Sequence, residues 1–129
     1  MSKLLSQLNF IKEIDKLKYI QRRTKLFNSE RHENDAEHSW HLAMMTIILA
    51  EHSNSPVDVL KVLKMVLIHD IVEIDAGDIF IYDTLQSHTN TEQELLAAKR
   101  IFGLLRNFYR SDFYARPTSA LKMKSITLL

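Results

Sequence analysis

Residues that interrupt helices are scarce in this chain, because only two glycines and two prolines occur among its 129 residues. Glycine and proline are the residues least favourable in a helix interior, so most of the chain can form helices without a break. An apolar fraction of 46% and a charged fraction of 26% are typical of a globular protein with one core. The sequence therefore predicts an all-α fold, a compact single-domain helical bundle over residues 1–129.

Hydrophobic periodicity and capping residues predict about five helices in this bundle. Their expected ranges are 3–20, 35–53, 56–72, 91–109 and 118–128. The second helix is expected to begin at Asn34 or Asp35, whose short side chains can accept from free backbone amides. Because its apolar residues are almost uninterrupted, this helix is expected to be buried on most of its circumference.

The third expected helix is the most apolar and is expected to be the central helix of the fold. Ser55 as N-cap and Pro56 at the first helical position predict where it starts. Gly77 marks a break, and residues 78–90 are expected to form a loop. Thr91 and Glu94 match a capping box, which predicts the start of the fourth helix.

Charge and cysteine content limit the possible partners and metal sites. With 17 basic and 16 acidic residues the net charge is +1, so binding to a polymeric nucleic acid is not expected. No apolar run is long enough for a membrane span, and the N-terminus lacks a signal-peptide core, so the expected location is cytoplasmic. Because the chain has no cysteine, a metal would need histidine, carboxylate or water ligands.

A chemical anomaly lies at the end of the third expected helix, where ionisable side chains follow a long apolar run. His69 and Glu73 are one helical turn apart, and Asp70 lies about 100° around the helix. Buried carboxylates are normally paired, hydrogen-bonded or bound to a metal, so a divalent ion could lie beside this helix end. The competing interpretation is an ordinary helix C-terminus with solvated carboxylates.

A second histidine strengthens the metal interpretation. His38 precedes Leu42, Met45 and Leu49 on one apolar stripe of the second helix, which predicts that its side chain faces inward. A lone histidine on such a stripe is more often a core residue than a ligand. Two inward histidines on separate helices, one beside an aspartate, fit a divalent transition metal such as Mn, Co, Fe or Zn.

The chain also resembles a known family, the HD-domain metal-dependent phosphohydrolases, and within it the bacterial 5'-deoxynucleotidase branch. The resemblance rests on residues 33–40 (Glu-Asn-Asp-Ala-Glu-His-Ser-Trp), followed by His69-Asp70, Glu73 and Gly77-Asp78. It covers about residues 8–104 and fades after about residue 105. The resemblance implies a helical bundle, often a homodimer, that acts on a small phosphorylated substrate, with nucleoside 5'-monophosphates as the expected class.

Site roles follow from the resemblance residue by residue. It implies that the metal ligands are His38, His69 and Asp70, and that the groups acting on water or on the leaving oxygen are Glu73 and Asp78. Arg23 matches the spacing of the family's phosphate-binding arginine, and Arg22 is the alternative.

The chain departs from the family pattern near its C-terminus. The family supplies a further aspartate ligand from a late helix, whereas no acidic residue or histidine follows Asp112 here, and Asp112 itself comes too early. This departure leaves a second hypothesis open, a helical binding or regulatory module with an incomplete metal site and no turnover.

Overall fold

The structure is a computed structural model that describes residues 2–77 and 87–105. Its helices and strands, in chain order, are α1 (Lys3–Ile14), η1 (Asp15–Tyr19), β1 (Gln21–Lys25), β2 (His32–Asn34), α2 (Asp35–Leu49), η2 (Ala50–His52), α3 (Val59–Ile68), α4 (Glu73–Ala76) and α5 (Ser87–Gly103). The predicted all-α class is confirmed, with one small hairpin added between α1 and α2. Within the described ranges, no helix has the length and apolar character needed to cross a membrane.

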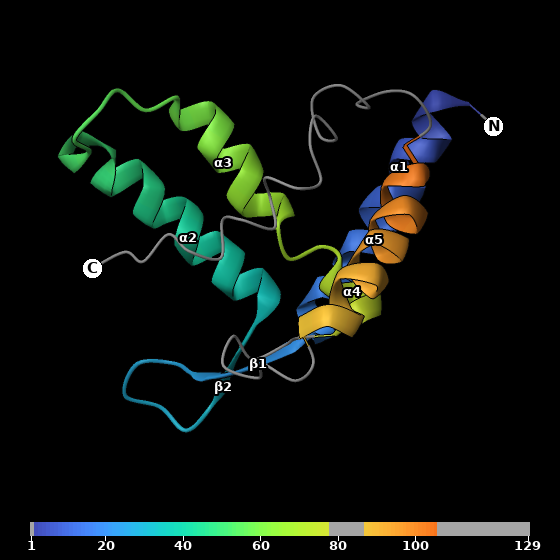
Figure 1. The fold of residues 1–129 in the computed structure, drawn as a ribbon, viewed down its shortest axis with the longest axis horizontal. Coiled ribbons are helices and arrows are strands. Elements are labelled where there is room, and N and C mark those ends of the chain that lie inside the picture. Colours follow the sequence, from blue (N-terminus) through green and yellow to red (C-terminus); the bar gives the residue numbers. More distant parts are fainter. Residues whose placement is uncertain (1, 78–86, 106–129) are drawn as a thin grey trace.

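The helices pack in two groups (Figure 1). In one group α2 and α3 run side by side, and in the other α4 and α5 lie against α1. The second group encloses a small apolar core of Ile71, Ala97 and Ile101, which is extended by partly buried neighbours that include Phe10 and Phe102. Ile71 follows directly on the His69-Asp70 pair, so this core fixes the turn between α3 and α4 from one side.

The hairpin of β1 and β2 connects the two groups. Its strands are antiparallel, with Gln21 opposite Asn34 and an irregular register toward Lys25. Asn28, in the connecting turn, has a φ of 54°, a conformation that asparagine tolerates better than most residues. The backbone amide of Asp35 then donates to the carbonyl of Ile20 at 2.9 Å, which fixes the start of α2 beside the start of the hairpin.

The predicted start of α2 is confirmed by a complete capping box. The Asn34 side chain accepts from the Glu37 amide at 2.9 Å, and the Glu37 carboxylate accepts from the Asn34 amide at 3.1 Å. The hydrogen bond from the Asn34 amide lowers the pKa of Glu37, and the hydrogen bond from the Arg31 guanidinium lowers it further. The box satisfies free amides at the helix start and so defines where the first turn of α2 lies.

The prediction that α2 is buried on most of its circumference is wrong. Its buried residues are Asp35, Ser39 and Ala43, a single stripe at four-residue spacing. Apolar side chains on other faces are exposed, among them Trp40 at 63% and Ile48 at 60%. A helix is buried only where another element covers it, and within the described ranges α3 covers one side of α2.

The predictions for the third helix also need correction. Asp58, and not Ser55, is the N-cap of α3, because its side chain accepts from the Lys61 amide at 3.1 Å. No residue of α3 is fully buried, so it is not the central helix. The helix ends at Ile68, and a turn over residues 69–72 leads into α4.

The fourth expected helix is present but begins earlier than predicted. Thr91 lies inside α5, which starts at Ser87, so the Thr91 capping box was a wrong start signal. Gly77 does break the chain as predicted, with a φ of 78° that suits glycine. Residues 78–86 of the expected loop, the end of the fourth helix beyond residue 105 and the expected helix 118–128 lie outside the described residues.

Candidate metal centre

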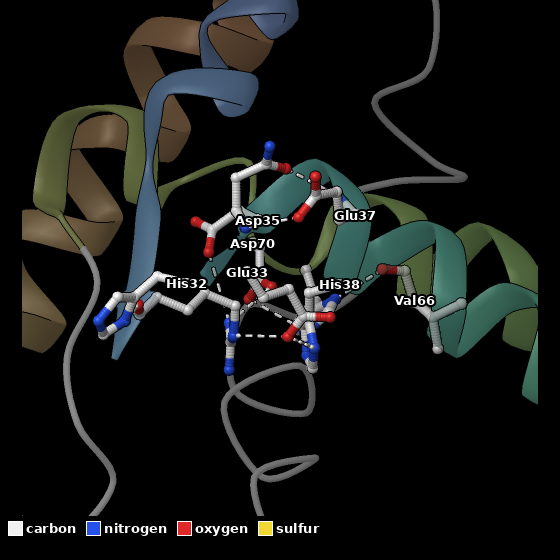
Figure 2. Close-up of polar contacts among 10 residues, drawn as sticks. His32, Glu33, Asp35, Glu37, His38, Val66 and Asp70 are labelled. Carbon is white, nitrogen blue, oxygen red and sulfur yellow. Dashed lines mark hydrogen bonds and ion pairs between the residues drawn. The ribbon is translucent and has the colours of Figure 1, made fainter. Parts of the chain in front are cut away.

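Three side chains named from the sequence come together where α2 meets the turn after α3. His38, His69 and Asp70 each offer a ligand atom, and these atoms all lie within 4.8 Å of one another. His38 comes from the first turn of α2, whereas the other two come from the turn after α3, where His69 is the exposed C-cap of that helix and Asp70 follows it. Figure 2 shows His38 and Asp70 close together at this junction.

The imidazole of His69 is oriented by the backbone. Its Nδ1 lies 2.6 Å from the carbonyl oxygen of Val66, and a carbonyl can only accept, so Nδ1 carries the proton and donates. The other ring nitrogen, Nε2, lies 3.1 Å from Asp70 Oδ1, and in the neutral form of the ring it is this nitrogen that carries the lone pair. Such a backbone contact is the usual way in which a metal-binding histidine is held in one tautomer.

The imidazole of His38 lies beside an acidic neighbour. Its Nδ1 lies 3.4 Å from Glu33 Oε2, and its ring centroid is 6.0 Å from that of His69. Burial lowers the pKa of His38, and the nearby positive charge of Arg22 lowers it further, so the neutral imidazole is favoured. The neutral form is the one that can bind a metal ion.

A second group of carboxylates adjoins the first and shares Asp70 with it. Oxygens of Asp35, Asp70 and Glu73 lie within 4.8 Å of one another, and Asp35 is fully buried. The sequence interpretation treated Asp35 only as a possible helix start and missed its place here. The available signal was its position one helical turn before His38, which directs both side chains toward one side of α2.

Arg22 provides the positive charge of this cluster. Its Nη1 lies 3.4 Å from Asp35 Oδ1 and 3.3 Å from Asp70 Oδ2, and its Nε lies 3.8 Å from Glu33 Oε2. Arg23, the residue named first from the family spacing, is exposed. Successive residues of a strand point to opposite faces, which explains why the two arginines differ.

The donor set fits a divalent ion. Two imidazoles and a carboxylate match the ligands that divalent transition metals accept. Among the described residues, the Arg22 guanidinium faces several carboxylates of the cluster. Buried carboxylates are normally paired, hydrogen-bonded or bound to a metal, and a divalent ion would meet this need for Asp70. Asp78, which the resemblance assigned to the leaving oxygen, lies outside the described residues.

The comparisons with known proteins agree with this arrangement. The HD domain family matches residues 14–116, a range that contains every residue of the cluster. The chain belongs to the HD domain family. A curated relative, "5'-deoxynucleotidase HDDC2" of Danio rerio, is 27% identical over 110 residues, which cover 84% of this chain and 54% of the relative.

A solved structure is more similar to this HD domain. It is the crystal structure of a protein described as a predicted metal-dependent phosphohydrolase from Magnetospirillum magnetotacticum MS-1, with 48% identity and a TM-score of 0.75. The match covers 95% of this chain and 56% of that one. The HD domain therefore spans a little over half the length of both relatives.

Proposed function

We propose that this HD domain is a metal-dependent phosphohydrolase that acts on small phosphate monoesters, with nucleoside 5'-monophosphates as its substrate class. The observation that carries the proposal is the convergence of His38, His69 and Asp70 within 4.8 Å, with the carboxylate of Glu73 beside them. The descriptions of the two relatives, a 5'-deoxynucleotidase and a metal-dependent phosphohydrolase, support the reaction class.

His38, His69 and Asp70 would hold the ion. A bound divalent metal supplies a polarised phosphoryl oxygen and a water of lowered pKa. The two nitrogen ligands favour a transition metal such as Mn, Co, Fe or Zn over Mg. The contact from His69 Nδ1 to Val66 keeps the remaining ring nitrogen directed toward Asp70 and the ion, so little ligand motion is needed on binding.

Glu73 is the proposed acceptor of the water proton. Its carboxylate belongs to the group with Asp70 and Asp35, so it lies next to a proposed metal ligand, and its position at the start of α4 gives it a fixed backbone. Asp78 is the proposed donor to the leaving oxygen, on the resemblance alone. A general acid-base group of this kind typically contributes ~10²–10⁴-fold to the rate.

An arginine beside the ion is the proposed phosphate clamp. Family spacing favours Arg23, whereas the contacts favour Arg22, whose Nη1 is 3.3 Å from Asp70. A guanidinium offers a planar fork of donors that lysine cannot reproduce. Comparing Arg22→Lys with Arg23→Lys identifies the clamp, because the variant of the clamp should raise the KM for the nucleotide more than the other variant does.

Metal content and turnover test the proposed function together. Protein purified without chelator should contain a transition metal by elemental analysis, and it should release phosphate from nucleoside monophosphates. His69→Ala should lose metal and activity, whereas His52→Ala, which changes a histidine with a side chain 72% exposed, should keep both. Glu73→Gln should lower kcat by ~10²-fold or more at unchanged metal content. Full metal content in His69→Ala would refute the ligand assignment.

A non-catalytic binding or regulatory module is the second candidate. Such a module would keep the proposed metal and nucleotide sites and lack turnover. Metal binding and nucleotide binding without phosphate release would support this candidate over the hydrolase.

A further inference from the structure

One buried carboxylate of the cluster, that of Asp35, has no role in the mechanism above. Asp35 is the first residue of α2 and is 0% exposed. Its Oδ1 lies 3.4 Å from Arg22 Nη1, and the same nitrogen lies 3.3 Å from Asp70 Oδ2. The guanidinium of Arg22 is therefore shared between a buried carboxylate outside the proposed ligand set and a carboxylate within it.

The two oxygens of Asp70 have different surroundings. Oδ2 faces Arg22, whereas Oδ1 lies 3.1 Å from His69 Nε2, on the side of the proposed ion. A cation drawn fully onto Asp70 would compete with the metal for this carboxylate, because both interactions use the same negative charge. Asp35 limits that competition because it attracts Arg22 from the other side.

We propose that Asp35 is a positioning residue for the metal centre: it shares Arg22 with Asp70 and so keeps Asp70 available to the cation. The inference rests on the proposed metal site and adds a residue that acts on it through Arg22. Without the Asp35 charge, Arg22 pairs more strongly with Asp70, and the affinity of the site for a divalent ion falls.

The Asp35 carboxylate can be tested without removing the cap of α2. Asn34 and Glu37 form the capping box, and the Asp35 backbone amide donates to Ile20 whatever the side chain is. Asp35→Asn keeps the size of the side chain and removes its charge. A control is Asp58→Asn, the same chemical change at the exposed N-cap of α3, where asparagine also caps well.

The experiment measures Mn²⁺ binding to the full chain by isothermal titration calorimetry, with Mn²⁺ as the sole ligand. It compares the wild type with Asp35→Asn, Arg22→Gln and the double variant. Asp35→Asn should weaken Mn²⁺ binding by about tenfold, which corresponds to ~1.4 kcal/mol. The same change should have little effect when Arg22 is already Gln, because the competing cation is gone. Asp58→Asn should bind as the wild type does.

Each result separates the inference from the proposed function. Wild-type affinity in Asp35→Asn, or an equal loss with and without Arg22, would overturn the role of Asp35 alone. Absence of Mn²⁺ binding by the wild type would overturn the metal centre and the role of Asp35 with it. If circular dichroism shows that Asp35→Asn does not fold, Asp35→Ser gives the same comparison with a smaller side chain.

Discussion

Truncation of Ile101 is the most direct test of how the core supports the metal centre. Ile101 is 0% exposed and packs with Ile71 and Ala97, and Ile71 directly follows Asp70. Ile101→Ala removes buried carbon atoms worth about 0.8 kcal/mol each and leaves a cavity, so we expect a loss of ~3–4 kcal/mol. This is a large part of the ~5–15 kcal/mol by which such domains are stable.

Urea denaturation followed by far-UV circular dichroism measures this loss. Ile101→Val should cost only ~1 kcal/mol, because it removes one methyl-sized group. Leu96→Ala is the matched control on the same helix, since Leu96 is 61% exposed, and it should change the free energy of unfolding by less than ~0.5 kcal/mol. Equal losses in Ile101→Ala and Leu96→Ala would refute the assignment of the core to this face of α5.

Three further predictions concern the cap, the surface charges and the ion. Asn34→Ala should lower the free energy of unfolding by ~1 kcal/mol in the same assay, and Asn34→Asp should not. Arg100, which contacts Glu13 and Asp75 and lowers the pKa of both, should contribute no more than ~1 kcal/mol because its own side chain is 46% exposed, so solvent and salt screen its charge. That contribution is present above the ordinary carboxyl pKa values of ~4 and is lost as the pH falls below them, so Arg100→Gln should match the wild type near pH ~2–3 or in ~1 M salt. Mn²⁺ at ~100 times its Kd should raise the wild-type free energy of unfolding by ~2.7 kcal/mol in the urea assay and leave His69→Ala unchanged.

Local sequence signals were enough to predict the parts of the fold that depend on neighbouring residues. The start of α2 was predicted at Asn34 or Asp35 from side chains that can accept from free backbone amides, and Asn34 is its N-cap. The break at Gly77 follows from the backbone conformation that glycine permits. His38, His69 and Asp70 could be grouped because a histidine on the apolar stripe of one helix and a histidine-aspartate pair at the end of another suggest a shared metal, although His69 is exposed and lies just beyond α3.

Features that depend on the packing of distant segments could not be predicted in the same way. Hydropathy gives the preference of Ile48 for burial, but only the arrangement of the other helices decides whether anything covers it. Asp35 was interpreted only as a possible helix start, and Arg22 only as the alternative phosphate-binding arginine. Their contacts join residues that are 13 and 48 positions apart, which local signals do not reveal. The choice between Arg22 and Arg23 depends on which face of β1 each occupies, and the spacing to His38 does not determine that.

Asp70 lies between the proposed metal centre and the apolar core, so we expect core stability and metal affinity to be thermodynamically linked. Its carboxylate faces the histidines and Arg22, while the next residue, Ile71, is buried against α5. If the core holds Asp70 in its binding geometry, Ile101→Ala should gain less stability from a fixed Mn²⁺ concentration than Leu96→Ala does, because its Kd is raised. If the core contributes only to global stability, both variants have the wild-type Kd and gain equally. The comparison therefore distinguishes a core that merely folds the domain from one that also shapes its metal centre.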